Sequence, residues 1–191
     1  MTDNSLLSPR IHRPILLVSV LLVASIAVSA YFGSLKPKAT RATVASGLLE
    51  FSIELDKTEF IQQGERVNIT FSLINTSNKT IKLDWSSFFI AFDQTFYFDF
   101  YIMDANGTRI YQWSYGHGRY MGNSSVVLNP SERVTSLNKW PQVYGEHSGY
   151  DGIVPKGTYS VAGCTRWIML TIDGQVTEAK LETPTLSFTI T

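Results

Sequence analysis

The sequence predicts an all-β protein, an antiparallel β-sandwich that follows one apolar segment at the amino terminus. Two observations predict the sandwich. From about residue 47 onward, hydrophobic and polar residues alternate over many short segments, which is typical of antiparallel strands that bury one face. Charged residues make up only 17% of the chain and aromatic residues 13%, a composition that favours a sheet protein with a large apolar core.

The apolar segment covers residues 14–32 (PILLVSVLLVASIAVSAYF) and carries no charge over its 19 residues. A membrane-spanning helix needs about 20 residues. The run also fits a cleavable signal peptide with Val28-Ser29-Ala30 as its cleavage site, but it is longer than a typical signal core. We therefore predict a tail over residues 1–13, a single-pass transmembrane anchor over 14–33, a tether over 34–46 and a β-sandwich domain over 47–191.

Orientation across the membrane rests on two opposing signals. Arg10 and Arg13 precede the apolar segment, whereas Lys36, Lys38 and Arg41 follow it, so positive charge does not favour an exported domain. Asn-X-Ser/Thr sequons favour export, because they are acceptors for N-glycosylation. The chain has five of them where about one is expected by chance. They begin at Asn68, Asn75, Asn78, Asn106 and Asn123. All five are predicted to face solvent, although these residue types are also common in ordinary β-turns.

The strands follow from the alternation in chain order. The first half predicts strands over residues 49–55, 67–73, 81–85 and 96–102, and Asn106-Gly107 then marks a hairpin. The second half predicts strands over residues 108–113, 126–128, 133–140 and 186–190. A further strand follows Pro155-Lys156-Gly157 and either ends at Gly163 or continues to Thr171. Roughly seven to nine short strands separated by turn signals indicate a sandwich of immunoglobulin-like type.

Few residues in the domain suit catalysis or cofactor binding. The domain has only two histidines, His117 and His147, and neither lies in a metal-binding spacing. No serine lies in a G-x-S-x-G turn. Cys164 is the only cysteine and lies among apolar strand residues, which predicts a packed thiol. We therefore predict no enzyme activity, no cofactor and no metal.

Charge also argues against nucleic acid as a partner. Residues 1–41 have five basic residues and one acidic residue, and the remaining 11 basic and 15 acidic residues give the domain a net charge of −4. Nucleic-acid binding calls for clustered positive charge.

Two loops rich in glycine and tyrosine suit protein recognition instead. Such loops combine backbone freedom with contact area. The candidate partner-binding residues are Tyr115, His117, Arg119 and Tyr120 in the first loop, and Tyr144, His147 and Tyr150 in the second. The alternative is that both loops are ordinary connections at the ends of a sandwich.

Several segments resemble one known family. They are Phe98-Asp99-Phe100 with Asp104 and Gly107, Tyr111-Gln112-Trp113-Ser114 with Gly116, Leu128-Asn129-Pro130-Ser131-Glu132, Trp140, and Val154 to Gly163 (VPKGTYSVAG). In order and spacing, over roughly residues 60–165, they resemble the BsuPI family of intracellular proteinase inhibitors, except that Ser131 replaces the glycine of the family's turn. The resemblance implies an immunoglobulin-like all-β fold and proteinase inhibition, but it identifies no inhibitory residue.

Two functional hypotheses result. The first is a membrane-tethered, extracytoplasmic proteinase inhibitor that binds its protein partner through loops. The second is a non-inhibitory structural or adhesion-like binding module at the cell surface. The apolar segment and the sequons depart from an intracellular inhibitor, and fold alone does not decide function.

Overall fold

The computed structural model describes residues 40–91, 94–96, 98–116 and 119–191, within a compact unit that covers residues 38–191. The predicted anchor at residues 14–33 lies outside the described residues and stays a prediction. Among the residues that are described, no helix is long and apolar enough to cross a membrane.

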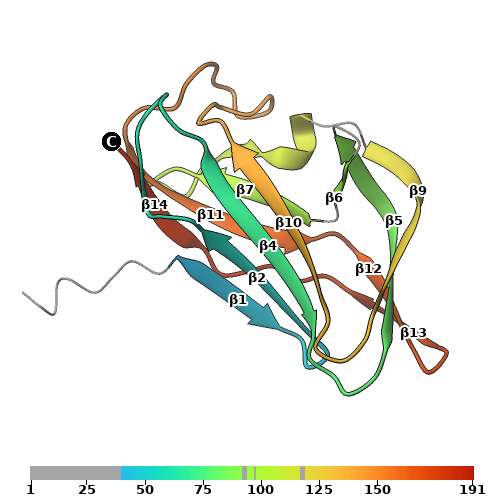
Figure 1. Ribbon diagram of the computed structural model, residues 1–191. Helices are drawn as coiled ribbons and strands as arrows, with labels where there is room; N and C mark the ends of the chain where they lie inside the picture. The colour runs from blue at the N-terminus through green and yellow to red at the C-terminus, as the bar shows by residue number, and fades with distance from the viewer. Residues whose placement is uncertain (1–39, 92–93, 97, 117–118) are drawn as a thin grey trace, which may run out of the picture. The chain divides into compact units, whose positions relative to one another are not determined.

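The described part of the chain is built from strands, with one short 3₁₀ helix (Figure 1). This confirms the predicted all-β class. The elements are β1 (Arg41–Ala45), β2 (Leu49–Leu55), β3 (Glu59–Phe60), β4 (Val67–Asn75), β5 (Ile81–Ala91), β6 (Gln94–Phe96), β7 (Phe98–Met103), β8 (Arg109–Gln112), η1 (Trp113–Gly116), β9 (Arg119–Leu128), β10 (Arg133–Trp140), β11 (Gly157–Thr165), β12 (Ile168–Ile172), β13 (Gln175–Ala179) and β14 (Leu186–Ile190).

The strands form three sheets. The first has the order β1-β2-β4-β10, the second β3-β14-β11-β7-β8, and the third β13-β12-β5-β6 with β9 also paired to β5. Among the described strands every pairing is antiparallel except that of β3 with β14. The strand count exceeds the prediction mainly because β1, β3 and β13 lie in segments where no strand is predicted. In addition, the segment after Gly157 is divided, since β11 ends at Thr165 and β12 begins at Ile168 in another sheet.

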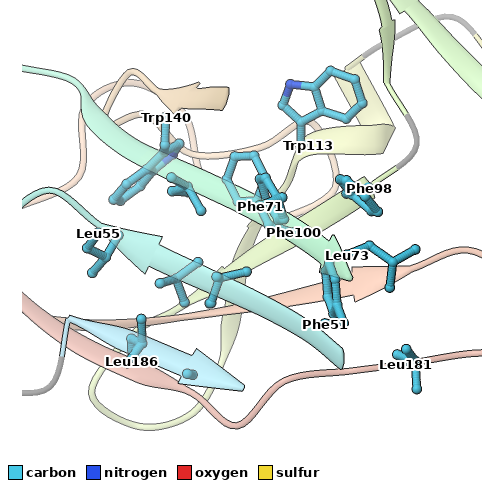
Figure 2. Packing of buried hydrophobic residues seen from close by; sticks show 14 of the residues in the cluster. Phe51, Leu55, Phe71, Leu73, Phe98, Phe100, Trp113, Trp140, Leu181 and Leu186 are labelled. Carbon is cyan, nitrogen blue, oxygen red and sulfur yellow. The ribbon is translucent and has the colours of Figure 1, made fainter. Parts of the chain in front are cut away.

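The first and second sheets pack face to face around aromatic side chains (Figure 2). Phe51 of β2 and Phe71 of β4 lie 5.3 and 5.7 Å from Phe98 of β7, measured between ring centroids. These rings are fully buried, and each such side chain contributes about 1.5–3 kcal/mol to folding. The contact between the two inner faces confirms the predicted sandwich.

One glycine sets how closely the two sheets approach. A Cβ atom on Gly163 of β11 would lie 2.3 Å from Ile53 Cγ2 and 3.0 Å from the Phe71 ring. No side chain fits at the first of these distances without movement of the neighbours. Gly163 therefore lets β11 lie directly against β2 and β4.

Two expectations are corrected. Strand β1 lies inside the predicted tether and pairs with β2 along its whole length, so the domain begins before residue 47. Asn75 was expected to face solvent but is fully buried. Its amide Nδ2 donates to the carbonyl oxygens of Lys79 and Leu128, at 2.7 and 2.9 Å, and so joins two turns.

We predict that Gly163→Ala lowers the free energy of unfolding by about 1–3 kcal/mol, because the added methyl group overpacks the contact between the sheets. Gly64→Ala is the matched control, since its Cβ would meet only the exposed side chain of Ile61 and no closer than 3.2 Å. Urea unfolding of both variants measures the difference. Equal midpoints would contradict the role given to Gly163.

Candidate functional site

Two loops far apart in the sequence meet at one end of the sandwich. The first is η1, which follows β8, and the second covers residues 141–156 between β10 and β11 (Figure 1). The rings of Tyr115 and His147 lie 4.8 Å apart in an edge-to-face arrangement. Within the second loop, the rings of Tyr144 and Tyr150 lie 5.2 Å apart. The structure thus brings together four of the seven candidate partner-binding residues.

The other three candidates are less fully described. His117 lies outside the described residues. Arg119 and Tyr120 begin strand β9, where Tyr120 pairs with Phe88 and Arg119 with Phe89 of β5; their side chains are outside the described part. Their part in binding stays a prediction.

Backbone hydrogen bonds hold the second loop as a narrow hairpin. Val143 bridges Ile153, and the N–H group of Tyr144 donates to the carbonyl oxygen of Gly152 at 3.0 Å. The loop is also joined to β8, because the N–H group of Gly145 donates to Ile110 O at 2.8 Å. A Cβ on Gly145 would lie 3.2 Å from the Tyr111 Cα, so glycine permits this close approach.

A buried glutamine fixes the base of the same loop. The Gln142 side chain donates to Ile61 O and accepts from the N–H group of Gln63, both at 3.0 Å. Its backbone is in the left-handed region, with φ of 60°, which is uncommon for a residue other than glycine. Sequence reasoning missed Gln142, because a lone glutamine after a proline carries no signal.

Exposed apolar side chains lie on these loops and beside them. Tyr150 is 60% exposed, Tyr115 48% and Ile153 45%. Ile61, whose carbonyl oxygen accepts from Gln142, is 59% exposed. We call these four residues the apolar rim. Aromatic and apolar contacts of this kind are enriched where proteins bind one another.

A cavity of about 250 Å³ opens between β8 and the second loop. Arginine, histidine and hydroxyl-bearing residues contribute to its lining. The lining residues are Arg109, Ile110, Tyr111, Gln112, Tyr115, Gly145, His147 and Ser148.

A buried carboxylate holds η1 against the second sheet. Asp99 of β7 is 2% exposed, and its Oδ1 accepts from the backbone N–H group of Ser114 at 3.1 Å. Its Oδ2 accepts from Gln112 Nε2 at 2.9 Å and pairs with Arg166 Nη2 at 3.4 Å. A charge removed from water in this way is stable only with such partners, so Asp99 fixes the position of the residues beside Tyr115.

Burial also affects nearby acidic groups. It raises the pKa of the Tyr111 phenol to about 12, and the negative charge of Asp99 adds to the effect. Burial likewise raises the pKa of the Cys164 thiol to about 12. A thiol is a nucleophile only when ionised, so this supports the prediction of a packed, unreactive cysteine.

The sequon asparagines differ in exposure. Asn78 and Asn106 are exposed, whereas Asn68 is half-buried and donates to Asp56 Oδ2 at 2.8 Å. The side chain of Asn123, in β9, is outside the described part. Among the described residues, no three His, Cys, Asp or Glu side chains are grouped so that they could hold a metal ion.

The geometry defines the class of protein as a β-sandwich that presents paired loops at one end. The family model described as intracellular proteinase inhibitor (BsuPI) matches residues 53–167, and the chain belongs to this family. The match confirms the resemblance found in the sequence. A search of curated proteins gave no match.

Solved structures give weaker similarities. An X-ray structure of structural-genomics target SoR45 is 16% identical with a TM-score of 0.37, covering 77% of this chain and 90% of that one. The putative ApaA protein from Bordetella pertussis is 11% identical with a TM-score of 0.34, covering 81% and 96%. A β-glucosidase from Erythrobacter marinus is 15% identical with a TM-score of 0.35, covering 78% of this chain but only 16% of the enzyme. Similarities this low carry no argument about function.

We predict that Asp99→Asn lowers the free energy of unfolding by about 1–3 kcal/mol, because an amide group would face donors that now meet a carboxylate. Asp99→Ala, which removes both acceptor oxygens, should also speed hydrogen exchange at the Ser114 amide, because the N–H group of Ser114 then loses its acceptor. Asp173→Asn is the matched control: its ion pair with Lys79 is exposed and contributes less than about 1 kcal/mol. Unchanged exchange at Ser114 in Asp99→Ala would show that Asp99 does not hold η1.

Proposed function

We propose that this chain is a membrane-tethered proteinase inhibitor with an immunoglobulin-like domain, which binds its target through the loops at one end of the sandwich. Membership of the inhibitor family supports a proteinase as the partner. The contact between Tyr115 and His147 joins η1 to the second loop. This contact is the observation that supports the two loops as the binding surface. The protein acts by binding and not by catalysis.

The second loop has the property that an inhibitory loop needs. An inhibitor must present its loop already ordered, since ordering a loop on binding reduces affinity. Here the Val143–Ile153 bridge, the bond from Gly145 to β8 and the bonds of Gln142 all act before any partner arrives. The apolar rim then supplies the contact area.

We further propose that residues 14–33 anchor the chain and that the domain lies outside the cytoplasm. The uncharged length of residues 14–32 and the number of sequons support this location. An inhibitor placed there would meet proteinases at the membrane surface.

Inhibition is tested with the full-length chain in detergent against a panel of serine proteinases. We expect nanomolar inhibition of at least one enzyme, and Tyr150→Ala should weaken it by roughly ten-fold or more, as loss of a central interface aromatic does. Trp167→Ala is the matched control, since Trp167 is 57% exposed but follows β11 in the chain and lies outside both loops. No inhibition across the panel would contradict the proposal and favour the structural or adhesion-like alternative.

The location is tested by mass spectrometry of the protein isolated from its native host. We expect glycans at Asn78 or Asn106, whose side chains are exposed, and none at Asn75, whose amide is buried and hydrogen-bonded. Protease added to intact cells should also cleave the domain. Full resistance of the domain, together with unmodified sequons, would place it inside the cell.

A further inference from the structure

The cavity beside the second loop is lined by basic residues and by no acidic residue. Its lining includes Arg109 and His147 but no aspartate or glutamate. At about 250 Å³ it is smaller than the roughly 300–1,000 Å³ typical of small-molecule sites. A site of this size suits a single side chain, and its charge suits a negative one.

Arg109 is held in place without a carboxylate partner. Its Nη1 donates to Gln112 Oε1 at 2.9 Å, and its Cζ lies 4.2 Å from the centroid of the Tyr101 ring. None of the ion pairs found within the described residues includes Arg109. An arginine carries five N–H donors, so donors remain for a ligand after the bond to Gln112.

Two carboxylates that are linked to Arg109 through Gln112 and Tyr101 already have other partners. Asp99 accepts a hydrogen bond from Gln112 and pairs with Arg166. Glu182 accepts from the hydroxyl of Tyr101. Neither neutralises Arg109 by direct contact, although Gln112 links its guanidinium to Asp99 and keeps it oriented.

We propose that this cavity binds an aspartate or glutamate side chain on the surface of the protein partner. This inference rests on the proposed function, because it takes the loop end to be the surface that meets the target. The carboxylate accepts from the free N–H groups of Arg109, which is the donor best matched to a planar carboxylate. The apolar rim at the same end of the sandwich contacts the protein surface that carries this side chain.

The test uses the full-length chain in detergent micelles at low salt, followed by NMR. The probe is N-acetyl-glutamate methylamide. The control compound is N-acetyl-glutamine methylamide, which has a similar shape but no charge. We expect the acidic probe to shift the ring signals of Tyr115 and His147 with a millimolar Kd, roughly ten-fold tighter than the neutral probe. Added salt should weaken binding, because the site is open to solvent.

Variants identify the donor. Arg109→Gln should reduce binding of the acidic probe to the level of the neutral probe, whereas Arg109→Lys, which keeps the charge, should keep part of the affinity. Arg133→Gln is the matched control, since Arg133 is exposed at the start of β10 and does not line the cavity. Equal binding of the two probes, or an unchanged Kd in Arg109→Gln, would overturn the inference. So would acetate binding as tightly as the acidic probe, which would indicate a site for small anions.

The two proposals fail in different ways. Inhibition of a proteinase that is unaffected by Arg109→Gln would overturn the carboxylate site and leave the inhibitor proposal standing. Binding of the acidic probe that depends on Arg109, with no proteinase inhibited, would support the site and contradict the inhibitor proposal.

Discussion

The candidate site depends above all on one buried side chain, Trp140 at the end of β10. Its ring is fully buried and lies about 6 Å from the rings of Tyr111, Tyr159 and Phe188. Its indole N–H group donates to the carbonyl oxygen of Val143 at 2.9 Å. Trp140 therefore belongs to the sandwich core and also holds the start of the second loop. The packing of the core thus helps to keep this loop in one conformation.

The far end of the loop has a matching attachment. Tyr159 of β11 packs on Phe188 and donates from its hydroxyl to Pro155 O at 2.6 Å. An aromatic ring can do this because it fills an apolar site while its polar group reaches a backbone partner. With Trp140 and Tyr159 at its two ends, the loop is supported where it leaves the sheet and where it returns.

The sequence predicts those parts of the fold that local periodicity controls. Strands β2 and β4 alternate cleanly, and their bounds were close to the predicted 49–55 and 67–73. The turn before β10 was also recognisable, although Ser131 stands where the family has glycine and adopts a φ of 67°. That strained position is compensated locally, since Ser131 N–H donates to Asn75 O and Asn129 N–H donates to Glu132 Oε2.

The remainder depends on contacts between distant segments, which periodicity does not encode. Asp99 alternates with Phe98 and Phe100, so its position along β7 suggests the outer face and water. It is buried because η1 and Arg166 lie over that face and supply donors. Gln142 and the buried amide of Asn75 are similar cases, because each is explained only by partners brought close through folding.

The two loops of the site are positioned by different means, which matters for how ordered the surface is. The second loop is attached to the aromatic core through Trp140 and Tyr159, whereas η1 is attached through the buried charge of Asp99. They meet at Tyr115 and His147 and share the wall of one cavity. A surface built from two separately attached loops is ordered only as well as the weaker attachment. The Asp99 carboxylate is also linked to Arg109 through Gln112, so this one group supports both the first loop and the arginine that lines the cavity.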